Sequence, residues 1–462
     1  MHISERLAEF VEGTSFRNLP QTTHDLAKKA VLDFLGVSVA GSTSDWSKIV
    51  LGVVRSGGAS HATVIGEAEK TSVFNAALAN GTMAHSHDFD DVHNASATHP
   101  GSAVISAALA CAEKEGTDGE TFIAAIVLGY DAMIRLSLAL NPESHYRRGF
   151  HPTATCGTFG AAVTASKILS LESEKIANAL GIAGSFAAGL LEFLADGAMT
   201  KRLHPGKAAQ NGLLSAYLAR DGFTGPKSVF EGRDGVLHAY SDASNAELLL
   251  SDLGSSFKIL EDSFKPYACC RCSHSAIDAL FSIMKKTGVN AESISAMDAK
   301  TPSWAARLVS EPSERKYHPE TMLEAQMSLP YSLAVAAYRG TALLNEFQGE
   351  NLRDPKILNL ARRVQAARDE GLDEACKSRP DTIPAVVEVR TIEGKVYVER
   401  VDYAKGDPQN PMNSEEHHAK FKSLMAHRFD EKTTEMIADT VDRLEKLQRI
   451  EELASLLRMA SR

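Results

Sequence analysis

The chain has few cysteines and few long apolar runs for its length. Six cysteines among 462 residues are too few for a disulfide scaffold, so we expect reduced thiols and a cytoplasmic location. The first thirteen residues carry charges throughout and predict an amphipathic helix, not a secretory signal. The uncharged run at 176–191 is sixteen residues long, which is short for a membrane span, so we expect a buried core helix there and no membrane partner.

Positive charge is also scarce. The formal net charge is −10, which argues against nucleic acid as a general partner, because a nucleic-acid-binding surface is usually basic. Hydrophobic residues make up 44% of the chain and charged residues 23%, a mixture typical of a globular protein with a sizeable core. The length allows two or three domains, or one large domain with a second attached.

Helical patterns dominate the first 260 residues. We expect helices that begin at the cap residues Thr23 and Ser72, and a third from Pro100 to a stop at Gly116. Later, ESISAMDAKTP predicts a strand, and AVVEVRTIEGKVYVERVDY alternates on both sides of Glu393-Gly394, which predicts a β-hairpin. The chain then returns to an amphipathic helical pattern.

This order predicts a mainly α fold. A large helical domain would take residues 1–260 and 405–462, and a smaller α+β domain, residues 261–404, would be inserted into it.

The segment HSHDFDDVHNASATHPG, residues 85–101, holds four histidines and three aspartates. A metal site, a proton-transfer site and a polar turn are three interpretations of it. His85 and Asp88 lack the spacing typical of zinc ligands, so we expect no metal. His99 precedes Pro100 at a predicted helix start, where the helix dipole binds anions and lowers the pKa of a histidine. That placement favours proton transfer near neutral pH.

Two further His-Pro steps follow. In GFHPTATCGTFGAA, residues 149–162, His151 and Thr153 stand where a helix rich in small residues would begin. In DGAMTKRLHPGKAAQNG, residues 196–212, the third step carries a basic cluster. A solvated turn is one interpretation, but the apolar segments on both sides favour a pocket for an anion. The polar residues of that cluster are Lys201, Arg202, His204 and Lys207.

A fourth segment, FKPYACCRCSH, covers residues 264–274. Cys269 and Cys272 have CxxC spacing, but no second pair accompanies them and no βαβ context is evident, so we favour neither a metal nor a redox site. We interpret the segment as a pocket wall in which Lys265 and Arg271 supply positive charge.

These four segments, followed by AQMSLPYSLAVA, resemble in the same order the signature segments of the MmgE/PrpD family, which includes 2-methylcitrate dehydratase, cis-aconitate decarboxylase and iminodisuccinate epimerase. The resemblance spans essentially the whole chain. It implies a large helical domain with an α+β lid domain, a homodimer, and neither metal nor organic cofactor.

Carried over by motif, the resemblance implies catalytic roles for Asp88, His99, His151, Lys201, Lys265 and Tyr331. We assign substrate binding to Asp91, Thr153, Arg202, His204, Lys207, Arg271 and His274. The lysines would hold carboxylates and stabilise developing negative charge, the histidines would move a proton, and the tyrosine would donate a hydrogen bond or act as an acid.

Two positions depart from the decarboxylase-like pattern of the family. That pattern has a threonine after DFDD, where this chain has Val92, and a histidine five residues after the lysine, where this chain has Cys270. We therefore predict a cofactor-independent lyase of the 2-methylcitrate dehydratase type that acts on a small di- or tricarboxylate. An epimerase or a decarboxylase in the same pocket is the nearest alternative. A non-catalytic carboxylate-binding protein and a metal hydrolase built on His85, His87 and the aspartates are the others.

Overall fold

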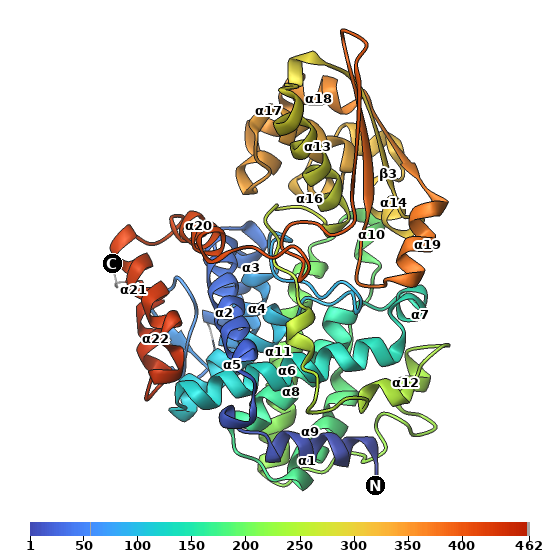
Figure 1. Cartoon of the computed structure of the whole chain (residues 1–462). Helices are drawn as coiled ribbons and strands as arrows, with labels where there is room; N and C mark the ends of the chain where they lie inside the picture. Colours follow the sequence, from blue (N-terminus) through green and yellow to red (C-terminus); the bar gives the residue numbers. More distant parts are fainter. Residues whose placement is uncertain (56, 460–462) are drawn as a thin grey trace. The chain divides into compact units, whose positions relative to one another are not determined.

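The computed structural model describes residues 1–55 and 57–459, and helices make up most of it (Figure 1). The chain divides into two compact units. Unit 1 contains Met1–Ser86, Asp90–Asp262 and the chain from Asn413 onwards, and unit 2 contains His87–Phe89 and Ser263–Met412. The mainly α fold predicted from the sequence is confirmed.

In the described part of unit 1, helices are accompanied by a short antiparallel pair of strands, β1 (Ala62–Thr63) and β2 (Lys70–Thr71). Its helices are α1 (Ile3–Gly13), α2 (Gln21–Gly41), α3 (Asp45–Arg55), α4 (Val73–Ala84), α5 (Pro100–Glu115), α6 (Gly119–Leu140), α7 (Pro142–Arg147), α8 (Pro152–Ile168), α9 (Ser173–Phe186), α10 (Phe193–Asp196), α11 (Thr200–Arg220), α12 (Val236–Ala239), α20 (Ser414–Met425), α21 (Glu431–Asp442) and α22 (Glu451–Leu456).

Local signals set several of these helix ends. The Ser72 side chain accepts a hydrogen bond from the amide of Asn75 at the start of α4, as predicted. α5 begins at Pro100 and ends before Gly116, whose φ of 68° is left-handed, and both ends are confirmed. The predicted cap at Thr23 is wrong: α2 begins at Gln21, because the Thr23 amide already bonds the carbonyl of Pro20.

The centre of unit 1 is a group of closely packed helices, α4, α5, α6, α8 and α11. Small residues allow this approach. A Cβ on Gly81 of α4 would lie only 2.6 Å from the Cα of Gly206 on α11, so glycine is required where these two helices cross. The crossing fixes the first turns of α11 against the end of α4, where the candidate site begins.

Two apolar segments bear on the question of a membrane. Among the described residues, α6 has the length and composition of a membrane span, but 94% of its most apolar window is buried inside the protein, as in a core helix. The core helix expected over residues 176–191 is only partly correct. α9 ends at Phe186, the backbone then turns away, and Leu190 is 59% exposed.

Unit 2 combines helices with a mixed sheet of order β4-β3-β5-β6. β3 (Ile294–Thr301) pairs in parallel with β4 (Val364–Arg368) and antiparallel with β5 (Ala385–Thr391), which pairs antiparallel with β6 (Val396–Val401). The helices are α13 (His274–Thr287), α14 (Ser303–Val309), α15 (Ser313–Tyr317), α16 (Met322–Gln326), α17 (Leu329–Arg339), α18 (Pro355–Ala361) and α19 (Glu370–Ser378).

The predicted hairpin is confirmed as β5 and β6, with Gly394 in the turn at a φ of 81°. The predicted strand in ESISAMDAKTP is confirmed as β3. Buried residues alternate along β5, whose inner face is covered by α13. The parallel partner β4 was not foreseen, because its sequence VQAAR has no clear alternation.

Candidate active site

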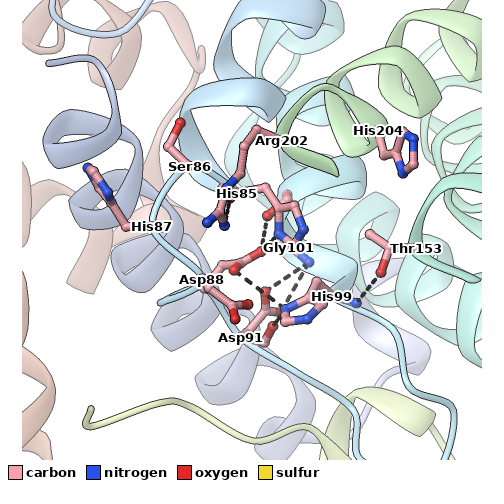
Figure 2. A network of polar contacts seen from close by, with 12 residues as sticks. His85, Ser86, His87, Asp88, Asp91, His99, Gly101, Thr153, Arg202 and His204 are labelled. Atoms are coloured by element: carbon pink, nitrogen blue, oxygen red, sulfur yellow. Dashed lines mark hydrogen bonds and ion pairs between the residues drawn. The ribbon is translucent and has the colours of Figure 1, made fainter. Parts of the chain in front are cut away.

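The polar segment of residues 85–101 connects α4 to α5 (Figure 2). His85 is the C-terminal cap of α4, and His99 is the N-terminal cap of α5. Between them the chain contributes His87–Phe89 to unit 2 and returns to unit 1 at Asp90. The segment therefore supplies polar side chains to both units.

In unit 1 the centre of the group is Asp90, which is buried. Its Oδ2 atom lies 2.8 Å from His85 Nδ1 and accepts a hydrogen bond of 2.5 Å from Ser102 Oγ. Its Oδ1 atom lies 3.4 Å from His99 Nδ1. Burial by itself would raise the pKa of Asp90, but the adjacent His85 and His99 hold it well below its usual range. Asp90 is therefore a carboxylate that orients the imidazole of His85 and lies beside that of His99.

His85 is a neutral imidazole at physiological pH. Burial lowers its pKa to about 3, although Asp90 opposes that shift. Because the carboxylate of Asp90 can only accept, His85 Nδ1 carries the proton and Nε2 keeps its lone pair. His85 Nε2 is buried and has no hydrogen-bond partner among the residues that the structure describes. A carboxylate-oriented imidazole with an unoccupied lone pair is the arrangement of a general base.

His99 lies beside this pair, with its ring centroid 4.8 Å from that of His85. Its Nδ1 atom donates to the carbonyl oxygen of Asp91 at 2.8 Å, so its Nε2 atom is also the basic nitrogen. Its backbone amide donates to Thr153 Oγ1 at 3.2 Å, which joins the start of α5 to the start of α8 (Figure 2). Two helix N-termini therefore meet here, a setting that favours anions.

The carboxylate of Asp91 holds the start of α5 in place. Its two carboxylate oxygens accept from the amide of Gly101 at 3.1 Å, and Oδ2 also accepts from the Tyr130 hydroxyl at 2.6 Å. A Cβ at Gly101 would lie 2.7 Å from Asp91 Oδ1, so this contact requires glycine. The carboxylate predicted to bind substrate is thus directed at the first turn of α5.

His151 caps α8, as predicted, and is buried. Its Nδ1 atom lies 3.0 Å from Nδ1 of His204 on α11, and its ring centroid lies 6.1 Å from that of His85. Burial and the neighbouring His204 hold the pKa of His151 well below its usual range. Burial and the charge of Lys201 lower the pKa of His204 to about 4.

The third His-Pro step lies inside a helix, so the alternative interpretation of it as a solvated turn is wrong. Residues 200–220 form one helix, α11, with Pro205 inside it. The contact of Gly206 with Gly81 and the buried flanks favour a continuous helix over the local tendency of proline to break one.

The basic residues of α11 have three different surroundings. The positive charge of Lys201 acts on the rings of His85, His151 and His204. Arg202 is buried and donates from Nη1 to the carbonyl oxygen of His85 at 3.2 Å, so it caps the end of α4. Lys207 is exposed and donates to Gln210 at 2.7 Å, and the structure does not bring it into the histidine group.

In unit 2, Lys265 and Asp88 form a buried ion pair. Lys265 Nζ lies 3.0 Å from Asp88 Oδ1 and 2.7 Å from the Asp88 carbonyl oxygen, and the side chains are 1% and 4% exposed. The Asp88 backbone has a φ of 52°, the left-handed region. Gln326 fixes the same segment by donating to the carbonyl oxygen of His87 at 2.5 Å.

The other predicted site residues of unit 2 form hydrogen bonds or ion pairs with residues of the same unit. Arg271 pairs with Asp407 and donates to His274 Nδ1 at 2.8 Å. The Nε2 atom of His274 bonds the carbonyl oxygen of Cys269 at 3.2 Å, so this ring is held on both sides. Tyr331 is fully buried, and its hydroxyl donates to the carbonyl oxygen of Glu346 at 2.9 Å.

A cation is a further possibility for the centre of unit 1. Among the described residues, His85, Asp90 and His99 place one ligand atom each within 4.8 Å of one another. However, His85 Nδ1 and His99 Nδ1 already have the oxygen partners given above. These bonds leave the Nε2 lone pair of both rings available, so a cation or a proton from carbon could be accepted there without displacing them.

Sequence reasoning missed His85 and Asp90 as a pair, because it considered them as metal ligands or turn residues and not as hydrogen-bond partners. The available signal was a histidine at a helix end followed, five residues later, by the second aspartate of DFDD.

Comparison with known proteins agrees with the sequence motifs. Residues 5–249 match the MmgE/PrpD N-terminal domain, and residues 267–446 match the MmgE/PrpD C-terminal domain. The chain belongs to the MmgE/PrpD family.

Curated relatives are similar over nearly their whole length. The cis-aconitate decarboxylase of Aspergillus terreus is 27% identical over 98% of this chain and 96% of its own. The cis-aconitate decarboxylases of Mus musculus and Homo sapiens are 26% and 27% identical, each over 99% of this chain and over 93% and 94% of their own lengths.

Proposed function

We propose that this protein is a lyase that acts on a small di- or tricarboxylate by moving a proton at a carbon next to a carboxylate. The observation that supports the proposal most strongly is the neutral His85, oriented by Asp90 and placed beside His99. Such an imidazole can take a proton from carbon without first losing one of its own. Family membership supports the same class of substrate.

The surroundings of the imidazoles suit an anionic substrate. The starts of α5 and α8, joined by the His99–Thr153 bond, present positive dipole ends, and Lys201 adds a full charge close to the rings. Removal of a proton beside a carboxylate builds up negative charge on that group. Charges that are already in place stabilise this charge without reorganisation, which lowers the barrier.

In the proposed reaction, Nε2 of His85 or of His99 accepts the proton from carbon, and the other imidazole, when protonated, is the acid. Asp90 stabilises whichever imidazolium forms, since it lies within 3.4 Å of both Nδ1 atoms. His151 is the third candidate proton carrier. The catalytic roles predicted for Asp88, Lys265 and Tyr331 stay predictions.

For the bond that breaks, we propose elimination of water, as in the 2-methylcitrate dehydratase type. Decarboxylation is the second candidate, and the curated relatives named above favour it. Val92 and Cys270, which depart from the decarboxylase-like pattern, are the reason to place elimination first.

The test is incubation of the full chain with a panel of di- and tricarboxylates in heavy water, followed by mass spectrometry. Loss of water, loss of carbon dioxide, or deuterium exchange with inversion would indicate a hydro-lyase, a decarboxylase or an epimerase, respectively. We expect His85→Ala, His99→Ala and His151→Ala each to lower the rate by roughly 10²–10⁴, the usual contribution of an acid–base group.

A suitable control is His238→Gln, because His238 is an exposed histidine of unit 1 outside the group. If every panel compound binds without conversion, the protein is a carboxylate-binding protein and the proposal is wrong. A folded His85→Ala/His99→Ala double variant that keeps the parent rate would contradict the assignment of the base.

A further inference from the structure

His151 and His204 are hydrogen-bonded to each other, and the proposed reaction gives this hydrogen bond no role. The two Nδ1 atoms lie 3.0 Å apart. Two lone pairs at that distance repel, so one of the two nitrogens must carry a proton and donate it to the other. A buried imidazole is therefore hydrogen-bonded to a second imidazole on another helix.

These rings are part of a series that runs through unit 1. Successive ring centroids are 4.8 Å apart from His99 to His85, 6.1 Å from His85 to His151, and 5.2 Å from His151 to His204. His85 and His151 are buried, the side chain of His99 is 12% exposed, and His204 is partly buried. Figure 2 shows His204 on its own helix, to one side of His85 and His99.

Close packing holds the last two rings together. The ring of Phe193 contacts both, with centroids 6.0 Å from His151 and 5.7 Å from His204. A Cβ at Gly189 would lie 3.5 Å from His204 Nδ1 and 2.3 Å from the Cβ of Ala154, so only glycine fits beside this pair. The neighbours Met199 and Leu203 of His204 are exposed, which places this end of the series at the protein surface.

We infer that His204 is a proton relay that connects the buried imidazoles with solvent through His151. The inference rests on the proposed function for its role in turnover. His204 touches no reacting atom in this scheme. It acts through His151, as the group that accepts a proton from it or returns one to it.

The proton balance is as follows. A proton that arrives at Nε2 of His151 makes that ring cationic, and its Nδ1 proton then moves to Nδ1 of His204. His204 releases its Nε2 proton to water. One N–H bond forms and one breaks at each ring, so both finish neutral with exchanged tautomers. Passage of a proton in the opposite direction, from water to the active site, restores the first tautomers.

The surroundings favour this transfer. Both imidazoles are neutral near pH 7, because burial and nearby positive groups lower the pKa of each. Because the two groups are both imidazoles and their Nδ1 atoms lie 3.0 Å apart, the proton moves along an existing hydrogen bond. The groups that act on the pair are His85, His99 and Lys201, which lower the pKa of His151, and Lys201, which lowers that of His204.

A purely structural role for His204, in which it only orients His151, makes a different prediction. His204→Gln keeps a side chain that can hydrogen-bond His151 Nδ1 but that cannot pass a proton on. We therefore compare His204→Gln and His204→Ala with the parent and with His238→Gln, in the full chain and with the panel substrate that the parent converts.

We expect both His204 variants to lose roughly 10²-fold in kcat with little change in KM, at the lower end of the usual acid–base contribution. Added imidazole should restore much of the rate of His204→Ala and should have no effect on His238→Gln. A His204→Gln variant with parent kcat, or a loss that imidazole does not reverse although the variant is folded, would overturn the relay.

A second measurement needs no substrate. In protein labelled with ¹⁵N-histidine, NMR gives the rate at which the His151 ring proton exchanges with water, and His204→Gln should slow it at least about tenfold, since a buried ring then exchanges only through local opening. Unchanged exchange would refute the relay even if the enzyme is active. A parent that converts no panel compound would refute the proposed function, while the exchange rate still decides on the relay.

Discussion

The buried ion pair of unit 2 offers a quantitative test. Lys265 Nζ contacts both the carboxylate and the carbonyl oxygen of Asp88, and hardly any of either side chain is exposed. Replacing Lys265 with methionine keeps most of the volume and removes the charge. Asp88 would then keep a buried carboxylate without this cation, in a backbone conformation that costs an L-residue about 1–2 kcal/mol.

The expected loss follows from this geometry. Removing one partner of a buried ion pair destabilises a protein by about 3–5 kcal/mol, because the remaining charge has lost its compensation. In the double variant Lys265→Met/Asp88→Asn that charge is also gone. We therefore expect the double variant to recover about 1–3 kcal/mol relative to Lys265→Met, the penalty of one unsatisfied buried group.

The measurement must report on unit 2 separately, since a chain with two compact units need not unfold in one step. Amide hydrogen exchange of peptides from residues 263–412, with urea titration, does so. Lys286→Met is the matched control, because Lys286 pairs with Glu399 on the surface of the same unit and is 62% exposed. An exposed pair contributes only about 0–1 kcal/mol.

A Lys265→Met variant that is no less stable than Lys286→Met would refute the reasoning. The same variants test the predicted role of Lys265 in holding a substrate carboxylate. If Lys265→Met is folded and keeps the parent kcat/KM, Lys265 is structural only.

Four further outcomes are expected. Asp90→Asn should lower kcat by roughly 10²–10⁴ and leave substrate binding nearly unchanged, because it removes the carboxylate that orients His85, the proposed base; parent kcat in a folded variant would contradict this. The pKa of His85 is lowered to about 3 and that of His204 to about 4, against about 6.5 in an unfolded chain, so the unfolded state binds more protons. Urea titrations should therefore show that unit 1 loses stability as the pH falls from about 6.5 towards 4. Asp33 offsets part of this loss, because burial raises its pKa to about 6 and the folded state then binds the extra proton. Dialysis against a chelator should leave activity intact; loss that zinc or iron reverses would show that His85, Asp90 and His99 bind a metal. Light scattering should report a homodimer, and a monomer at micromolar concentration would contradict that expectation.

The sequence by itself determined the features whose physical cause is local. The cap at Ser72, the start of α5 at Pro100 and its end at Gly116 each depend on a side chain or a φ angle within one turn of the helix. The hairpin around Gly394 depends on alternation and one turn residue. His99 and His151 were placed at helix starts for the same reason, because each precedes a proline.

Tertiary structure alone decided which of these polar residues meet. His151 and His204 are 53 positions apart in the chain, and Lys265 and Asp88 are 177 apart. No periodicity relates such pairs.

Packing also overruled local preference. Pro205 stays inside α11 because Gly206 must contact Gly81, and the apolar run expected as one helix ends at Phe186. The role that we propose for His85 could not be inferred from the sequence, because it depends on a contact made in the folded chain. Only the turn that directs the ring of His85 at Asp90 distinguishes a proton acceptor from one more histidine in a polar loop.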